Sequence, residues 1–378
     1  MKRIFFVALA ATLLAAGCQK TEIINPVGEP SMSFTTGMNK LTKATTVADG
    51  TTNLQTQDFS VWAYAAFEDE NTTATEMDNI YDHIENLAVT YDETKQGWTT
   101  DKEYYWPGVG KDLCFYAVSA KGSWLRPTEG TAPVTVTPGA NPSMTIANFT
   151  VDAANPNEDL MVADFIQQNQ KEKAVALNFR HALSKVEFVF KTNAPATGST
   201  EDAPKVFVQN VKVAGMANVG TLTVTPEAPA TPEQQAEGDE NAYVPTVKLA
   251  HLDWGNTASG TVLFSDNWDE EATGFPTDVE KVDTENDYRT NALLLTTEPQ
   301  TFTTWLMLPQ SIQGKKVEIT YVINKRQFKS IFALETSSLK NWACNQYIKY
   351  TIVLAPNVIS FNPSVEDWDT ATDVGHTN

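Results

Sequence analysis

The feature that most restricts the fold of this chain is the alternation of apolar and polar residues over short segments separated by turn residues. Val317–Ile323 and Ile348–Leu354 carry an apolar residue at every second position, a period that puts those side chains on one face of a β-strand. Phe59–Phe67 and Leu113–Ser119 are apolar on both faces, as in strands buried on both sides. Phe328–Leu334 follows Val317–Ile323 after a short polar tip, which predicts a β-hairpin. Since no long segment has the period of an amphipathic helix, the sequence predicts an all-β chain of Greek-key or sandwich type.

Two of the expected strands change phase along their length. Within Leu177–Phe190 the apolar residues occupy one set of alternate positions before Ser184 and the other set after it, and Val206–Val213 changes in the same way near Asn210. A shift of one residue moves every later side chain to the opposite face, so we expect a β-bulge or a bend at each point. One segment, Thr75–Ala88, is the candidate for a short helix.

The chain has 378 residues, more than one hydrophobic core usually serves, so we expect two domains. With 42% hydrophobic and 20% charged residues, the composition is that of a globular protein rather than of a disordered one. The polar run Gln167–Lys173 marks the expected boundary, which gives an N-terminal β-sandwich at 51–172 and a C-terminal β-sandwich at 173–378. We interpret Pro226–Tyr243 and Ser265–Arg289 as surface insertions.

The acidic balance of the chain excludes one class of partner. Lys and Arg total 27 against 47 Asp and Glu, which gives a formal net charge of −20. A surface of this sign is repelled by the phosphate backbone of nucleic acids, and it gains nothing from the negative surface of a membrane. We therefore expect no nucleic-acid partner.

The first residues have the form of an export signal. Lys2 and Arg3 precede the apolar run Ile4–Leu14, which is too short to span a bilayer as a helix. Small residues at 15–17 and then Cys18 complete the pattern that lipoprotein signal peptidase reads. Residues 1–17 are therefore interpreted as a lipoprotein signal peptide, and Cys18 as the lipidated first residue of the mature chain. Several acyl chains on one residue, palmitate among them, give a stable membrane anchor. The alternative is an ordinary cleavage site with an incidental cysteine.

The other cysteines and the histidines show no metal-binding pattern. Cys114 and Cys344 lie far apart without a CxxC spacing, so we interpret them as two buried thiols, with one long-range disulfide as the alternative. None of the four histidines has the HxxxH or HxH spacing of a local metal site. His181 lies beside the phase change near Ser184 and is interpreted as a structural residue. We expect no metal site and no cofactor.

Catalytic motifs are also lacking. Gly108–Lys111 resembles part of a phosphate-binding loop, but Asp112 stands where a Ser or Thr would bind Mg²⁺. Asp283–Asp287 resembles the start of an EF-hand, but Tyr288 and Leu294 stand where that loop needs Gly and Glu. Weak Ca²⁺ binding by such an acidic loop stays open. No residue is singled out as catalytic, and we expect a protein that is not an enzyme.

The nine tryptophans allow two interpretations. Trp62 and Trp305 lie in apolar strands, and Trp106, Trp254 and Trp342 lie beside turns, so packing in the core is the preferred one. The alternative is a surface glycan-binding lipoprotein of a nutrient-uptake system, which requires exposed, coplanar Trp or Tyr. A third reading, a secreted hydrolase, requires a cleft with two convergent carboxylates of shifted pKa.

Several short motifs, taken in their order, resemble one family. Tyr104–Pro107 precedes the strand Leu113–Ala117, and Asp159–Met161 precedes a strand that carries His181–Ser184. Leu306–Gln310 follows. The series closes with Trp342, Asn345, Tyr347, Tyr350–Leu354 and Val365–Trp368. Behind a lipoprotein signal peptide, this order over most of the mature chain is similar to that of the fimbrillin family of Bacteroidales, the subunits of type V pili.

The resemblance implies two tandem transthyretin-like Greek-key β-sandwich domains and a structural or adhesive role without catalysis. It implies export as a lipoprotein to the cell outer membrane, surface exposure in a fimbrium, and other pilus subunits as head-to-tail partners. Gln19–Glu22 resembles the surface-export signal of Bacteroidetes lipoproteins, with a solvated tether as the alternative. Polymerisation in the family resembles donor-strand exchange. A protease removes an N-terminal strand that covers a groove, and an extended segment of the next subunit takes its place.

Candidate parts for such an exchange lie near both ends of the chain. Residues 18–50 hold the tether and the candidate occluding strand, in which Met32 and Phe34 alternate with serines. Ile359, Phe361 and Val365 in the C-terminal segment are the candidate donor residues.

The candidate processing site follows the occluding strand. Our hypothesis is cleavage by a trypsin-like protease between Lys43 and Ala44, or after Lys40. Pilins of the family are often cut by an Arg-specific protease, but here no arginine occurs between Arg3 and Arg126. Whether the subunit belongs to the shaft, the tip or the anchor of a pilus stays open.

Overall fold

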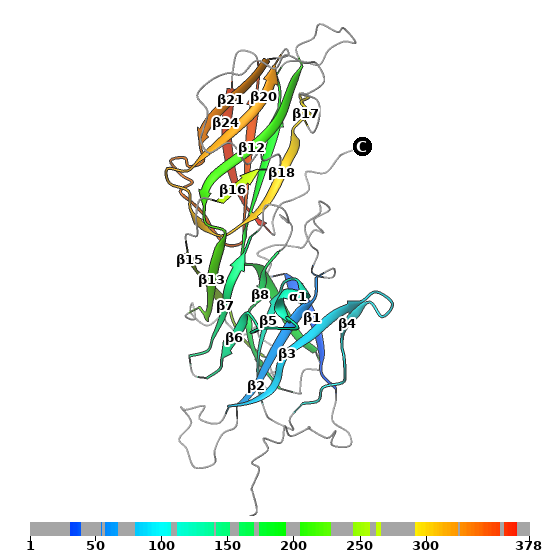
Figure 1. The fold of residues 1–378 in the computed structure, drawn as a ribbon. Coiled ribbons are helices and arrows are strands. Elements are labelled where there is room, and N and C mark those ends of the chain that lie inside the picture. The colour runs from blue at the N-terminus through cyan, green and yellow to red at the C-terminus, as the bar shows by residue number, and fades with distance from the viewer. Residues whose placement is uncertain are drawn as a thin grey trace, which may run out of the picture.

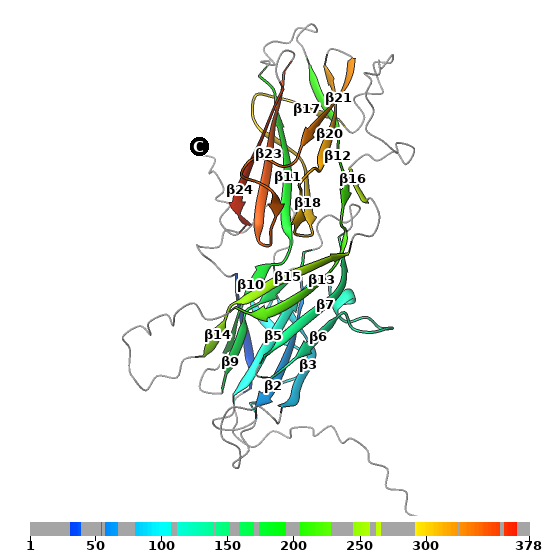
Figure 2. The same ribbon diagram turned by 90° about the vertical axis from the view of Figure 1, so that its left-hand side faces the viewer.

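Two groups of β-sheets, stacked end to end, make up the molecule (Figures 1 and 2). This computed structural model describes residues 31–38, 54, 57–66, 80–106, 112–139, 141–151, 159–169, 174–193, 205–227, 245–257, 262–265, 292–323, 326–355 and 359–368. Most of the described residues lie in strands, and the one α-helix among them is α1 (Gly122–Leu125). The prediction of an all-β sandwich fold is confirmed, whereas the Greek-key order stays a prediction.

The lower group in Figure 1 contains a nine-stranded sheet. Its main path is β1 (Ser33–Met38), β10 (Ala174–His181), β8 (Met161–Ala163), β5 (Leu113–Ser119), β2 (Phe59–Ala66), β3 (Ile80–Asp92) and β4 (Gly97–Thr100). The two remaining strands are β9 (Phe165–Gln168), which pairs with β5, and β14 (Thr246–Lys248), which pairs with β9. All these pairs are antiparallel except the pair of β1 with β10, which is parallel.

A second sheet covers one face of the nine-stranded sheet. Its order is β15 (Ala250–Thr257), β13 (Val219–Pro226), β7 (Ser143–Thr150) and β6 (Val134–Thr137). Met144, Ile146 and Leu222 of this sheet share a core with Trp62 and Tyr116 of the nine-stranded sheet. The opposite face of the nine-stranded sheet has a separate core of its own. Burial on both faces explains why β2 and β5 are apolar throughout, as the sequence predicts.

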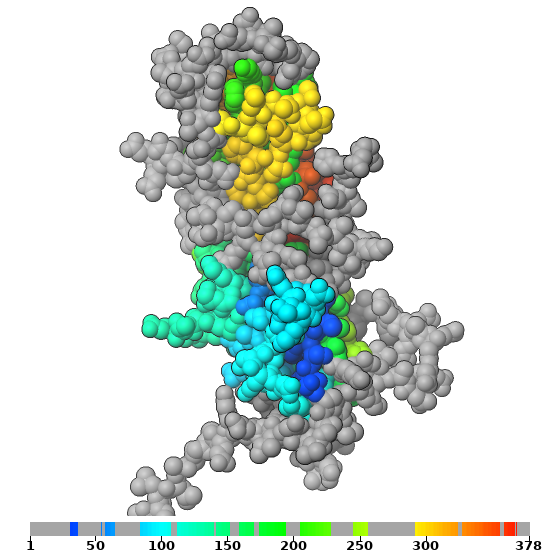
Figure 3. Space-filling model, turned by 90° about the vertical axis from the view of Figure 1, so that its right-hand side faces the viewer, coloured from blue at the N-terminus to red at the C-terminus, as the bar shows by residue number. Residues whose placement is uncertain are grey.

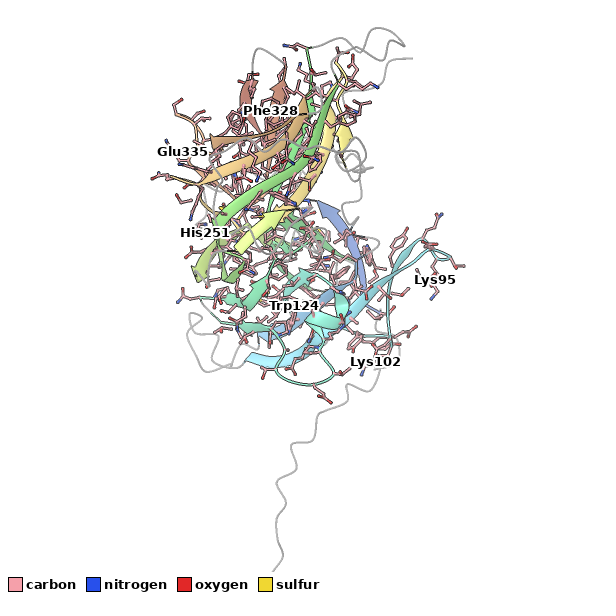
Figure 4. All side chains as sticks on the ribbon, turned by 45° about the horizontal axis from the view of Figure 1, so that its top comes forward. Lys95, Lys102, Trp124, His251, Phe328 and Glu335 are labelled. Atoms are coloured by element: carbon pink, nitrogen blue, oxygen red, sulfur yellow. The ribbon has the colours of Figure 1, made fainter. Side chains whose placement is uncertain are left out.

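The upper group is a sandwich of two sheets that share one core. One sheet has the order β18 (Gln300–Met307), β11 (Ser184–Lys191), β23 (Gln346–Leu354) and β24 (Ile359–Asp367), in which β11 and β23 are parallel. The other has the order β16 (Val262–Ser265), β12 (Val206–Met216), β20 (Lys316–Ile323) and β21 (Arg326–Ala333), with β17 (Leu293–Leu294) also on β12. A two-stranded sheet of β19 (Gln310–Ser311) and β22 (Asn341–Trp342) completes the strands. Figure 4 shows side chains filling the space between sheets in both groups.

Strand pairing crosses the boundary expected at 172/173. β10 belongs to the nine-stranded sheet, and β13, β14 and β15 pair within the lower group although they come after β11 and β12 in the sequence. The chain passes from the lower group to the upper one between His181 and Ser184, returns between Met216 and Val219, and crosses again after Thr257. The division into two domains stays a proposal, and strand pairing favours assigning these four strands to the first domain.

The helix expected within Thr75–Ala88 is not present at its described positions, because residues from Ile80 onward form β3. β3 pairs with β2 through two shifts of register, and Asn86 has a φ of 48°, a left-handed conformation that Asn tolerates. This irregularity buries Ile84 and Leu87, which are three residues apart, on one face of the sheet. The prediction was wrong because a spacing of three also fits one turn of a helix.

The two expected phase changes have different origins. Near Asn210 the register of β12 against β20 shifts between Val208 and Asn210, which confirms the predicted bulge. Near Ser184 the chain does not bulge within one strand. It ends β10 at His181 and begins β11 at Ser184 in another sheet.

Among the described residues, no helix has the length and the apolar character needed to cross a membrane.

Candidate functional site

The segment proposed as the occluding strand contains β1, which begins at Ser33 and lies at one end of the nine-stranded sheet. Phe34 is 5% exposed, and its ring meets those of Phe59 and Phe115 edge to face, with centroids 6.5 and 6.4 Å apart. Met32 is partly buried against the same core, and its backbone N–H donates to the carbonyl of Tyr104 over 2.7 Å. Both candidate residues, Met32 just before β1 and Phe34 within it, therefore contact the core of the lower group.

β1 is held from two sides. Its backbone pairs with β10 over its whole length. On the other side Trp98 of β4 donates its indole N–H to Thr36 Oγ1 over 2.9 Å, and the same indole packs on Phe59 at a centroid distance of 4.7 Å. Figure 3 shows β1 in blue beside the cyan segment that contains β3 and β4. The sheet thus curls until β4, at one end, reaches β1 at the other.

Removal of β1 would open an apolar slot. The core residues under this face, apart from Phe34 itself, are Leu54, Phe59, Val61, Ala63, Ile84, Leu87, Val89, Trp106, Leu113, Phe115, Ala117, Met161, Ala163, Ile166, Val175, Leu177 and Phe179. β10 would lose the strand that pairs with its outer edge, which leaves backbone N–H and C=O groups without partners. An open edge above an apolar floor is the structure that binds an added strand.

The candidate donor residues lie on β24. This strand is at the edge of the sheet β18–β11–β23–β24 in the upper group. β24 pairs only with β23, in antiparallel register. Phe361 is half-buried, and its ring stacks on those of Tyr350 and Phe332 at 5.1 Å each. Ile359 and Val365 are 36% and 44% exposed. Two of the three candidate residues are therefore accessible on the surface.

The residues of the export and processing hypotheses lie outside the described residues. These are Cys18, Lys40, Lys43 and Ala44. The two lysines follow the last residue of β1, Met38, in the sequence.

A third feature, at the junction of the two groups, involves a residue that the sequence did not single out by itself. Trp368 follows β24 and stacks on His181, the last residue of β10, with ring centroids 3.7 Å apart and an interplanar angle of 5°. Nδ1 of His181 lies 2.7 Å from Oδ2 of Asp159, which is fully buried. The expectation of a structural histidine agrees with this setting.

Backbone bonds tie the same junction together. Asn345 donates its N–H to the carbonyl of Leu183, and its own carbonyl accepts the N–H of Trp368, each over 3.0 Å. The indole of Trp254 donates to the carbonyl of Ala182 over 2.8 Å. Most of these residues belong to the motifs that carry the family resemblance, so those motifs meet in space where the two groups of sheets join. The one sequence feature that could have located this junction is that these motifs occur together in a fixed order.

The tryptophans that the sequence places in strands or beside turns pack in the core, as preferred from the sequence. Trp62, Trp106, Trp305 and Trp342 are buried, and Trp254 is partly buried against the core. No Trp or Tyr is exposed among those whose side chains the structure describes. The stacking surface that the glycan-binding alternative needs is therefore not formed by them.

Burial shifts the pKa of three ionisable groups near the junction and in the strands. Burial raises the pKa of the Asp164 carboxyl, against the opposing effect of the Arg180 guanidinium 2.8 Å away, and the same carboxylate accepts the N–H of Ala250. Burial also raises the pKa of the Cys114 and Cys344 thiols to about 11. Both cysteines are free and partly buried, so the long-range disulfide is not formed. The described residues contain no cluster of three or more His, Cys, Asp or Glu suited to a metal ion.

Comparison with known proteins gives one family match. The family described as fimbrillin-like matches residues 42–368. A search of curated proteins gave no match. Among solved structures, the chain is similar to a fimbrial protein from Bacteroides vulgatus at 15% identity and a TM-score of 0.48, covering 89% of this chain and 99% of that one. It is also similar to a fimbrial assembly protein from Parabacteroides distasonis at 10% identity and a TM-score of 0.35, covering 89% and 98%.

Proposed function

Because this chain belongs to the fimbrillin-like family, a family of structural, non-enzymatic subunits at the cell surface, we propose that it is exported as a lipoprotein and assembles into a type V-like pilus by protease-triggered strand exchange. In this proposal β1 is the occluding strand and β24 is the donor. Other pilus subunits are its partners, and the lipid on Cys18 holds the precursor at the outer membrane.

The observation that carries the proposal is the position of Phe34. A short N-terminal strand at the end of a sheet buries one aromatic ring among Phe59, Phe115 and their neighbours. Phe34 is the only side chain of β1 that is buried among those described. A strand held by one ladder, one buried ring and one side-chain hydrogen bond is replaceable by another strand with the same pattern.

β24 has that pattern. Met32–Met38 reads MSFTTGM, and Ile359–Val365 reads ISFNPSV. Aligned without a gap, the two segments share the Ser-Phe pair, and apolar residues occupy both ends of each. In this register Phe361 takes the place of Phe34, and Ile359 takes that of Met32. The register follows from period two, since a slip by one residue would turn the aromatic ring away from the slot.

In this proposal, cleavage after Lys43 or Lys40 starts assembly, because it allows β1 to leave its slot. Either cut separates β1 from the rest of the chain, after which only noncovalent contacts hold it in the slot. A trypsin-like protease fits these lysines, and the N-terminal segment that leaves would carry the lipid with it. An anchor subunit would instead keep Cys18 and stay uncut.

The test is treatment of the purified precursor with trypsin, followed by electrophoresis without boiling and by N-terminal sequencing of the products. We expect a new N-terminus at Ala44 or Leu41 and a ladder of oligomers. The matched control is Lys40→Gln/Lys43→Gln, which we expect to stay monomeric. Assembled protein that starts at the lipidated Cys18 would contradict the processing step.

A further inference from the structure

The C-terminal strand is held by its backbone ladder more than by its side chains. β24 forms a ladder with β23 alone. Its apolar side chains Ile359 and Val365 are exposed, and Phe361 is half-buried. Of the side chains described in residues 359–368, only that of Trp368 is buried, with 2% of its surface exposed. Besides its ladder with β23 and the ring stacks of Phe361, the segment is therefore held by the buried side chain of Trp368, the residue that follows β24.

Trp368 fixes the end of β24 to the other group of sheets. Its ring lies flat on His181 of β10, which belongs to the nine-stranded sheet. His181 is itself 7% exposed and is oriented by the buried carboxylate of Asp159. The His181 ring is thus held in place by Asp159, and the stack ties the end of β24 across the junction in addition to its ladder within its own sandwich.

The hold on the indole comes from packing. None of the described residues accepts a hydrogen bond from Nε1 of Trp368, although this atom is buried. A buried donor without a partner opposes burial, and stacking is lost over a short displacement. Beside the stack, the backbone N–H of Trp368 donates to the carbonyl of Asn345. The indole is therefore held while it is stacked on His181, but a small displacement removes most of the contact that holds it.

We propose that the Trp368–His181 stack is a latch that keeps β24 folded on its own subunit and that opens before β24 is donated to a second copy of the chain. The second half of this statement rests on the proposed function, whereas the first half concerns the isolated precursor. While the latch is closed, β24 stays paired with β23. It becomes available for donation only after the latch opens.

Hydrogen exchange of the precursor, resolved by peptide mass spectrometry, tests the latch. We expect Trp368→Ala to speed amide exchange in 359–367 by about tenfold or more, while β12 and β20 exchange as in the wild type. The matched control is Glu366→Ala, an exposed neighbour, which we expect to leave exchange unchanged. Exchange in β24 that is unaltered by Trp368→Ala in a folded protein would overturn the latch.

A second pair of variants separates the stack from general stability. Trp368→Phe keeps an aromatic face, and Trp368→Leu keeps apolar volume without one. We expect faster exchange in β24 with leucine than with phenylalanine, and equal exchange in both would overturn the stack as the latch. This pair decides the question if Trp368→Ala does not fold.

Assembly after trypsin separates the two proposals. Faster exchange in β24 together with faster ladder formation supports both. Faster exchange in a protein that never forms a ladder supports the latch and overturns strand exchange as the function.

Discussion

Phe34 shows how much of a strand's attachment can depend on one side chain. The rest of β1 is exposed or half-buried where its side chains are described, and its backbone pairs with β10 alone. The ring of Phe34 lies in a core built from the middle of the sheet, so its contacts are made with residues that also stabilise β2 and β5. Loss of the ring leaves a cavity that the neighbouring strands cannot easily close.

We therefore expect Phe34→Ala to lower the free energy of unfolding of the precursor by about 3–5 kcal/mol. Urea unfolding followed by tryptophan fluorescence measures this change. Thr35→Ala is the matched control, because Thr35 is exposed on the same strand, and we expect its effect to stay within about 0.5 kcal/mol. A loss below about 1 kcal/mol for Phe34→Ala would show that the ring is not a core residue.

The two thiols give a prediction about pH. Burial raises the pKa of Cys114 and Cys344 from 9.0 to about 11, so the folded chain holds these protons more tightly than the unfolded chain does. Their contribution to stability is complete below pH 9 and is lost as the pH rises from about 9 to 11. At pH 8 we expect both to react with iodoacetamide about a hundredfold more slowly in the folded protein than in urea, because two pKa units lower the thiolate fraction by that factor. Peptide mass spectrometry measures the rates, and similar rates in both states would contradict the burial of the thiols.

At the scale of elements, local pattern predicts strands better than it predicts their partners. The hairpin of β20 and β21, the strand β5 and the bulge at Asn210 all follow from period two and from its interruption. The pairing of β13 with β7 joins segments that lie far apart in the sequence, and nothing in either segment specifies the other. The helix expected near Thr75–Ala88 failed because an irregular strand and a helical turn share a spacing.

The candidate site also has one part that the local sequence pattern predicts and one part that depends on how the sheets pack. The family resemblance implies an occluding strand, and alternation within that segment points to Met32 and Phe34, since a strand that fills a slot needs one apolar face. The Trp368–His181 contact brings the end of β24 to the end of β10, two strands of different sheets. It depends on how the sheets stack, which alternation along one strand does not encode.

The register of β1 gives a prediction at this scale. Ser33 faces Ala174 across the parallel pair, and neither side chain is buried. We expect that the oxidised double variant Ser33→Cys/Ala174→Cys is still cut by trypsin but keeps β1 in its slot and forms no ladder of oligomers. Reduction of the disulfide should restore assembly.

Ser33→Cys alone is the matched control for this experiment, because it adds a thiol without a partner on β10. We expect it to assemble as the wild type does under both conditions. An oxidised double variant that assembles at the wild-type rate would show that departure of β1 is not required.

At the scale of the whole molecule, the two groups of sheets are joined more closely than two domains on a linker. The chain crosses between them at 181/184, 216/219 and 257/262, and Trp368 adds a contact by a side chain. One continuous core includes Tyr116 and Phe165 of the lower group and Tyr350 of the upper group. Opening the junction would thus expose apolar surface of both groups at once.

We therefore expect the precursor to unfold in one cooperative transition, with calorimetry, far-UV circular dichroism and tryptophan fluorescence giving the same midpoint. A fragment of residues 173–378 should fail to fold, because β13 would lose its ladder with β7 and β14 its ladder with β9. A fragment of residues 44–368 is the matched control, since it keeps every strand except β1.

Two separate transitions in the precursor, or a folded fragment 173–378, would contradict the expectation that the two groups of sheets unfold together. Either result would mean that the contacts at the junction are too weak to couple the two groups, and the latch would then have no rigid partner to close on.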